Sequence, residues 1–209
     1  MNEKKYGHWQ RLIAVFLEKN KQINLSAIRT PDGVYKKHIL DSLELIKVLG
    51  KSQDAYFKSL FDQPSVRLLD VWTGGGFPLI PLALSFSQIS CFGIDARRKK
   101  IHAVQDIVQT LGIPNIQLIR WRIEQHQQKY SIVTARGVAY ADKLFRWIYP
   151  LLEKWGYMIL RKLFTQEEDD MILGLIRQYD MTLTALHHYV LEDDDVERVV
   201  YVIQNRTKN

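Results

Sequence analysis

The feature that most constrains the fold is a run of three glycines at residues 74–76, between an apolar segment and a helical stretch. Residues 66–71 form a buried-strand candidate that includes Asp70, and residues 78–87 have the pattern of a helix. A strand followed by a glycine-rich turn that opens a helix lets a ligand approach the backbone closely. Three consecutive glycines cost backbone entropy, so we interpret this turn as a ligand-binding turn rather than a flexible connection.

The type of ligand is partly restricted by what the turn lacks. No Gly-Lys-Ser/Thr follows the glycines, which excludes a phosphate-binding P-loop. Trp72 stands where a pyrophosphate fingerprint would have its first glycine. Asp95 lies one residue past the next expected strand, where an acidic side chain can accept hydrogen bonds from both hydroxyls of a ribose. An adenosine-type ligand is therefore expected, with NAD, FAD and S-adenosylmethionine all open at this point.

Short apolar runs and helical stretches alternate from residue 66 onwards. We expect parallel strands at residues 66–71, 89–94, 116–119, 131–134 and 157–160. Helices are expected at residues 78–87, 99–111, 142–152 and 167–179. The last two runs, 182–191 and 196–204, flank an acidic turn and predict an antiparallel hairpin. This alternation predicts an α/β fold with a mostly parallel sheet covered by helices on both faces.

The first 64 residues have a different pattern, because only helical periodicity occurs there. Apolar residues recur at helical spacing from Trp9 to Leu17, and again over residues 39–49. Thr30 followed by Pro31 predicts a helix start, and a shorter helix is expected at residues 56–61. We therefore divide the chain into an N-terminal helical extension, residues 1–64, and an α/β domain, residues 65–209.

Composition adds expectations about environment and partners. The chain has 209 residues and a formal net charge of +6, which favours a polyanionic partner. Cys91 is the only cysteine, so no internal disulfide can form and a reducing compartment is expected. The N-terminus does not resemble a signal peptide, and no apolar run reaches membrane-spanning length. We expect a cytoplasmic monomer without a membrane segment.

Basic residues cluster at the expected carboxyl ends of strands. Arg97, Arg98, Lys99 and Lys100 open the helix after Asp95, and Arg120 and Arg122 follow the third strand. Like charges at a helix N-terminus are unfavourable, so contact with RNA phosphates is as plausible as simple solvation. Arg136 follows the fourth strand, and we expect it at the edge of the ligand-binding pocket.

Two other patterns predict no chemistry. His38, Asp41 and Ser42 lie within five positions of one expected helix, too close together to form a nucleophile, base and orienting group in line. The pair His187–His188 points to opposite faces of a strand, and no cluster of cysteines, histidines or carboxylates has metal-ligand spacing. We expect no catalytic triad and no metal.

Together these motifs resemble one family, the bacterial small-subunit rRNA methyltransferase G proteins (RsmG, also called GidB). The resemblance is carried by residues 24–28, 38–43, 70–83, 134–136 and 150–152, with His-Ile-Leu-Asp-Ser-Leu at 38–43 and Gly-Gly-Phe-Pro at 75–78. It implies the fold of a class I S-adenosylmethionine-dependent methyltransferase, which is a Rossmann-like domain with a seven-stranded sheet. In this chain the helical extension precedes that domain. The resemblance also implies methyl transfer to N7 of a guanine in 16S rRNA of the small ribosomal subunit, with no general base.

The resemblance also assigns site residues. The cofactor-binding residues that we expect are Asp70, Trp72, Gly74, Gly75, Gly76, Phe77, Asp95, Ile123, Glu124 and Arg136. Lys99 and Lys100 match a Lys-Arg pair that opens the same helix in the family and are expected, with Arg97, Arg98, Arg120 and Arg122, to contact RNA.

The chain departs from the family pattern at five glycine positions. Trp72, Trp121 and Trp155 replace three of them, and Leu79 and Leu163 replace two more. An alternative function is therefore a catalytically impaired member that keeps RNA or ribosome binding, because a turn needing positive φ tolerates tryptophan badly. A further hypothesis is that UGA codons, which some bacteria read as glycine, were translated here as tryptophan. A nucleotide-dependent enzyme of another kind, such as a dehydrogenase, is the third alternative.

Overall fold

A computed structural model describes residues 3–137, 140–192 and 194–206. Its centre is a seven-stranded sheet in the order β3-β2-β1-β4-β5-β7-β6. The first five strands in the chain run parallel, and β7 pairs antiparallel with both β5 and β6. The strand bounds are β1 Arg67–Val71, β2 Ser90–Ile94, β3 Ile116–Ile119, β4 Tyr130–Arg136, β5 Leu152–Leu163, β6 Met181–Val190 and β7 Glu197–Asn205. The predicted mixed sheet with one terminal hairpin is confirmed.

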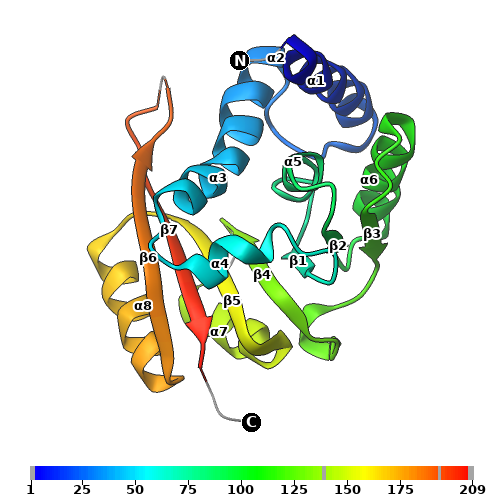
Figure 1. Cartoon of the computed structure of the whole chain (residues 1–209). Coiled ribbons are helices and arrows are strands. Elements are labelled where there is room, and N and C mark those ends of the chain that lie inside the picture. Colours follow the sequence, from blue (N-terminus) through cyan, green and yellow to red (C-terminus); the bar gives the residue numbers. More distant parts are fainter. Residues whose placement is uncertain (1–2, 138–139, 193, 207–209) are drawn as a thin grey trace.

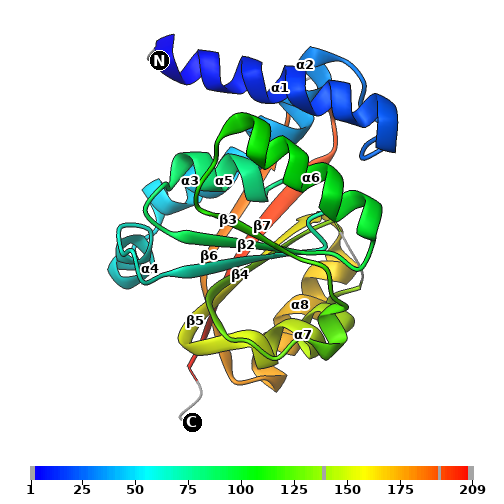
Figure 2. The same cartoon turned by 90° about the vertical axis from the view of Figure 1, so that its right-hand side faces the viewer.

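Helices cover both faces of this sheet (Figures 1 and 2). On one face lie α3 (Asp41–Lys51), α5 (Leu79–Ser85) and α6 (Arg98–Leu111), and on the other α7 (Ala141–Ile148) and α8 (Gln166–Gln178). Successive strand residues point to opposite faces, so Leu68 belongs to the first hydrophobic cluster and Leu69 to the second. Both side chains are fully buried, which explains why the central strands are almost continuously apolar.

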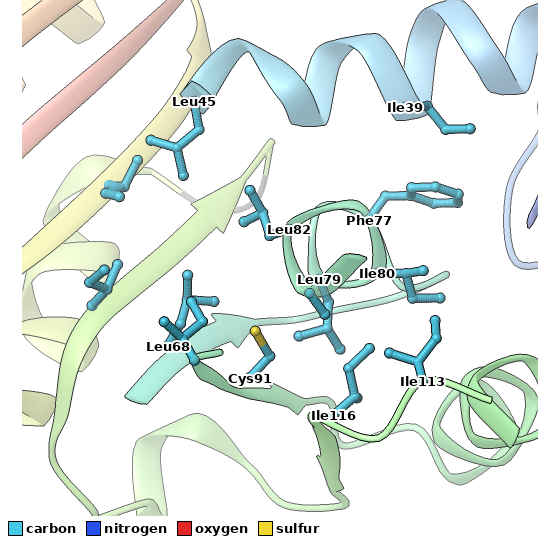
Figure 3. Close-up of a cluster of buried hydrophobic side chains, with 14 of the residues drawn as sticks. Ile39, Leu45, Leu68, Phe77, Leu79, Ile80, Leu82, Cys91, Ile113 and Ile116 are labelled. Atoms are coloured by element: carbon cyan, nitrogen blue, oxygen red, sulfur yellow. The ribbon is translucent and has the colours of Figure 1, made fainter. Parts of the chain in front are cut away.

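The N-terminal helices pack on the face that carries α6. Helix α1 (Glu3–Ile23) lies over α6, and its Phe16 belongs to the same hydrophobic cluster as Leu79 of α5. Figure 3 shows Ile39 of this cluster with Leu79 and Ile80 of α5. The short helix α4 (Ala55–Leu60) precedes β1. Burial of this shared apolar surface fixes the helical segments against the sheet.

The second helical segment contains a wide turn that the sequence does not reveal. Its start is confirmed, because the Thr30 hydroxyl accepts a hydrogen bond from the Gly33 amide at 3.2 Å. The segment then runs without a break through α2 (Pro31–Val34), a π-helical turn η1 (Tyr35–Leu40) and α3. Such π-turns are frequently found at functional sites, and this one carries His38.

The region between β4 and β5 differs from the prediction. The helix expected at residues 142–152 ends at Ile148, and a 3-10 turn, η3 (Tyr149–Leu151), leads directly into β5. Pro150 explains the early end, because it has no amide hydrogen to continue an α-helix. Strand β5 is also longer than predicted, and its first part is irregular, with Trp155 at φ +64° and a register shift against β4.

No helix among the described residues is both long and apolar enough to span a membrane.

Candidate active site

The turn between β1 and α5 is fixed to the end of β2 by backbone hydrogen bonds. The Thr73 amide donates to the Ile94 carbonyl at 3.1 Å, and the Gly74 amide donates to Asp95 Oδ2 at 3.2 Å. Gly74 and Gly76 have φ of +57° and +88°, a region that favours glycine. A Cβ at Gly76 would also lie 2.7 Å from the terminal side-chain carbon of Ile80, which would have to shift to admit a larger residue.

Asp95 has the position that the sequence predicted, at the carboxyl edge of the sheet beside the glycine turn. Its Oδ1 accepts a hydrogen bond from the Arg97 amide at 2.8 Å, while Oδ2 accepts the one from Gly74. The side chain is almost buried, and each carboxylate oxygen can accept one further hydrogen bond. The carboxylate is therefore held in place by the backbone and can still bind two neighbouring hydroxyl groups.

Three cavities lie around Trp72 at this edge. The first has a volume of about 390 Å³ and is lined by, among others, Trp72, Gly74, Asp95, Glu124, Lys143 and Trp147. A second cavity of about 80 Å³ includes Trp72, Asp95, Trp121 and Ile123. The third has about 210 Å³ and includes Phe16, Ser26, His38, Trp72, Gly75 and Arg136.

Most of the predicted cofactor residues line these cavities. Those that do are Trp72, Gly74, Gly75, Phe77, Asp95, Ile123, Glu124 and Arg136. Asp70 and Gly76 are not among the lining residues. Asp70 is buried beneath the turn, and this burial raises the pKa of its carboxyl group to about 7.

The predicted RNA residues divide into two groups. Arg97 and Lys100 line the first cavity and Arg122 lines the second, so these three lie beside the cofactor residues. Arg98, Lys99 and Arg120 line none of the three cavities and are exposed to solvent.

Trp72 itself has a left-handed backbone, with φ +54°. Its ring lies edge-on to that of Trp147 from α7, with 5.4 Å between the ring centroids. Trp147 and Lys143 are one helical turn apart on α7 and were missed by the sequence reasoning, since neither belongs to a motif.

His38 connects the third cavity to a network of charged side chains. Its Nε2 is 2.8 Å from the Ser26 hydroxyl, and its Nδ1 is 3.1 Å from the Arg136 guanidinium. The imidazole stacks on Phe77 at 4.7 Å between the ring centroids. Burial and the neighbouring Arg136 lower the pKa of His38 to about 4, so the imidazole is neutral at physiological pH. Ser26 and His38 lie in segments that carried the family resemblance, although neither was predicted to be a site residue.

Asp41 and Ser42 do not pair with the imidazole. Asp41 binds Arg136 at 3.0 Å, and the Ser42 hydroxyl donates to the backbone carbonyl of His38. These contacts direct the Asp41 carboxylate and the Ser42 hydroxyl away from the imidazole ring of His38. Within the described ranges, no group of three or more histidines, cysteines, aspartates or glutamates is arranged to hold a metal ion.

Comparison with known proteins finds relatives by sequence and, separately, solved structures of similar fold. The family model of rRNA small subunit methyltransferase G (GidB) matches residues 5–174. A protein named ribosomal RNA small subunit methyltransferase G from Leuconostoc citreum is 30% identical, over 100% of this chain and 86% of its own. The protein of the same name from Clostridium botulinum is 33% identical over 80% of this chain and 68% of its own.

Among solved structures, a SAM-dependent methyltransferase from Aquifex aeolicus has a TM-score of 0.60 at 13% identity. The match covers 82% of this chain and 92% of that one. At this level of identity the match concerns the fold alone.

Proposed function

Because the chain belongs to the rRNA small subunit methyltransferase G (GidB) family, we propose that it transfers a methyl group from S-adenosylmethionine to N7 of a guanine in 16S rRNA. The observation that carries this proposal is the position of Asp95 against the glycine turn, where the cavities around Trp72 meet. In an open α/β sheet, ligands bind at the carboxyl ends of the strands, which is where these residues lie.

The residues of the first two cavities fit the adenosine part of the cofactor. Asp95 offers two carboxylate oxygens to the ribose hydroxyls, and Ile123 and Glu124 border the space beside it. A volume of about 390 Å³ lies within the usual range of roughly 300–1,000 Å³ for small-molecule sites.

The third cavity fits the methionine part and the target base. The backbone at Gly74 and Gly75 borders it, and Arg136 places a guanidinium at its edge that can pair with the cofactor's carboxylate. Arg136 is held from behind by Asp41 and His38, so its position does not depend on the ligand.

The reaction needs alignment and a protected site rather than a proton acceptor. The bound cofactor supplies a methyl group on a positively charged sulfur. Guanine N7 has an in-plane lone pair and no proton, so the protein must hold it in line with the methyl group and exclude water. His38 remains neutral because its pKa is about 4, and it therefore adds no positive charge to a cavity in which positive charge is transferred.

The basic residues beside the cavity would contact the RNA backbone. Arg98, Lys99 and Arg120 are exposed on the side of the first two cavities, and Arg97, Lys100 and Arg122 lie at their edges. Contacts of this kind make RNA binding weaken as the salt concentration rises.

The test measures cofactor binding and methyl transfer separately. We expect saturable one-to-one binding of S-adenosylmethionine by calorimetry, and transfer of labelled methyl groups to small-subunit rRNA. Asp95→Asn removes a charge that accepts hydrogen bonds and is expected to weaken cofactor binding about 10- to 100-fold. Asp106→Asn removes an exposed carboxylate from α6 and is the matched control, since Asp106 forms an ion pair with Lys19 at 2.8 Å and lines none of the three cavities.

RNA binding without methyl transfer would contradict the proposed activity of this chain. Equal cofactor affinity in the two aspartate variants would contradict the assignment of Asp95.

A further inference from the structure

A second group of cations lies at the carboxyl ends of β4 and β5, next to the third cavity. They surround a cavity of about 180 Å³, called here the cation cleft, and they are Lys37, Arg136, Arg161, Lys162 and Arg198. The residues come from η1, β4, β5 and β7, so the fold and not the local sequence brings them together. The sequence motifs indicated only Arg136.

The cleft contains more positive than negative charge. Asp41 is bound by both Arg136 and Arg161, at 3.0 and 3.6 Å. Burial raises the pKa of Asp41, but the two guanidinium groups outweigh this effect and hold its pKa below the usual range, so it carries one negative charge. One carboxylate thus balances two guanidinium groups.

Arg161 is the most deeply buried cation of this group. Its side chain is 3% exposed, and Nη1 donates to the Asp41 carbonyl at 2.6 Å. Its Nη2 is buried and has no hydrogen-bond partner within the described residues. A buried, partly unsatisfied guanidinium is costly unless an anion compensates its charge.

Two further cations of the cleft, Arg198 and Lys162, form ion pairs with neighbouring carboxylates. Arg198 pairs with Asp194, and Lys162 lies 2.6 Å from Glu168. Among the described residues, four of the five cations form ion pairs with the three carboxylates of Asp41, Glu168 and Asp194. This charge balance attracts a polyanion.

An apolar platform continues from the cleft. A neighbouring cavity of about 380 Å³ shares Gly137, Lys162 and Leu163 with it and adds Tyr140. Tyr140 and Leu163 are 69% and 57% exposed, which is unusual for large apolar side chains side by side. Proteins that bind single-stranded nucleic acid typically combine a groove of cations, which contacts the sugar-phosphate backbone, with an exposed aromatic ring on which a base stacks.

We propose that the cation cleft binds a phosphate of single-stranded RNA adjacent to the target guanine, and that the neighbouring base stacks on Tyr140. The proposal rests on the proposed function, and it adds an RNA surface on the side opposite to Arg97–Lys100. Arg136 lines both the third cavity and the cation cleft, so a phosphate in the cleft belongs to a nucleotide beside the one that reacts.

The experiment compares RNA affinity in variants with matched controls. The double variant Lys37→Gln/Arg198→Gln removes two cations of the cleft without touching the cofactor cavities, and Tyr140→Ala removes the aromatic platform. Lys129→Gln removes an exposed cation before β4, at the opposite edge of the sheet, and Tyr56→Ala removes another exposed tyrosine. Binding of a fluorescein-labelled single-stranded fragment of small-subunit rRNA is followed by anisotropy at several salt concentrations.

We expect the double variant to bind the RNA about tenfold more weakly, with a salt dependence less steep by about one unit in log–log slope. Tyr140→Ala is expected to weaken binding about five- to a hundredfold. Calorimetry with S-adenosylmethionine should show unchanged cofactor binding in both, which also demonstrates that they fold.

RNA affinities within twofold of the Lys129→Gln and Tyr56→Ala controls would overturn the proposal. This result differs from failure of the proposed function. If the wild-type protein methylates no small-subunit rRNA, the assigned reaction is wrong, and the binding comparison still decides whether the cleft holds RNA.

Discussion

Replacement of Trp72 by glycine tests how this chain binds its cofactor. Trp72 has φ +54°, where a residue with a Cβ is less stable than glycine by about 1–2 kcal/mol. Its ring also lies on that of Trp147, a contact that contributes roughly 0.5–1.5 kcal/mol. Glycine at position 72 relieves the backbone strain, but the ring contact is lost. The greater conformational freedom of glycine in the unfolded chain also lowers the free energy of unfolding by about 0.5–1 kcal/mol. These effects oppose one another, so we expect little change in the free energy of unfolding.

Cofactor affinity should change much more clearly. Trp72 lines all three cavities, so we expect a ligand that extends from one cavity to another to displace the indole from Trp147. The ring contact is then lost during binding, which weakens the affinity by about 2- to 12-fold. Trp72→Gly removes this cost, and we expect it to bind S-adenosylmethionine more tightly by at least that factor.

Trp155→Gly is the matched control. Trp155 also has a left-handed backbone, with φ +64°, but it lies at the start of β5 and lines none of the three cavities. We expect this variant to be more stable than the wild type and to bind the cofactor with unchanged affinity. Calorimetry with S-adenosylmethionine and S-adenosylhomocysteine measures the affinities, and denaturant unfolding measures the stabilities.

Either of two results would refute the reasoning. If Trp72→Gly binds the cofactor no more tightly than the wild type, the indole is not an obstacle. If Trp155→Gly gains the same affinity, the effect comes from general stabilisation and not from the cavity.

Three further predictions concern buried groups and the gene. The pKa of His38 is about 4 in the folded protein and 6.5 when the group is unperturbed. The free energy of unfolding therefore falls by about 3 kcal/mol as the pH is lowered from 6.5 to 4. Denaturant titrations should show a smaller fall for His38→Asn over the same range. The pKa of Asp70 is raised from 3.8 to about 7, so the wild type loses stability as the pH rises from about 4 to 7. Over that range the free energy of unfolding of Asp70→Asn should increase relative to that of the wild type by up to about 4 kcal/mol. A difference between the two proteins that does not change with pH would contradict this. Gene sequencing should find UGA at codons 72, 121 and 155 and UGG at codons 9 and 147, whereas UGG at all five would contradict miscoding.

The pH dependence of stability in the wild type alone would not reveal either effect. Protonation of unfolded His38 and deprotonation of unfolded Asp70 change stability in opposite directions over nearly the same pH range. The two slopes largely cancel in the intact protein. Single variants remove one slope at a time and therefore reveal the other.

The alternation of strands and helices and the position of the cofactor edge could be predicted from sequence because their signals are local. The glycine turn and Asp95 each follow a recognisable apolar strand, and parallel strands place their carboxyl ends together. The start of the second helical segment was equally clear, since a Thr-Pro pair supplies both a cap and a first helical residue.

The network behind the site could not be predicted in the same way. Arg136 meets Asp41 across 95 positions of sequence, and Arg161 reaches the Asp41 carbonyl across 120. These contacts depend on the π-helical turn η1, which sets the direction of His38 and Asp41 and has no sequence signature. Pairing of Trp72 with Trp147 is likewise a product of tertiary packing, because it joins the β1–α5 turn to α7.

The five replaced glycines differ physically, and backbone conformation separates Trp72 and Trp155 from Leu79, Leu163 and Trp121. Trp72 and Trp155 both have a left-handed backbone, where the chain favours glycine. Leu79 and Leu163 do not: the first is fully buried at the start of α5, and the second is exposed at the end of β5. Leucine is an ordinary residue in both places, so divergence accounts for it.

Divergence does not account for the tryptophans equally well. Two strained tryptophans in one chain, one of them at the junction of three cavities, would each have to be retained against a cost of about 1–2 kcal/mol. Trp121, the third, is 54% exposed beside the second cavity, where nothing in its packing requires an indole. Glycine at all three positions removes both strained residues and opens the cofactor space. The hypothesis of UGA codons gives the three tryptophans one cause, and under it position 72 of the cofactor turn has the glycine of the family pattern.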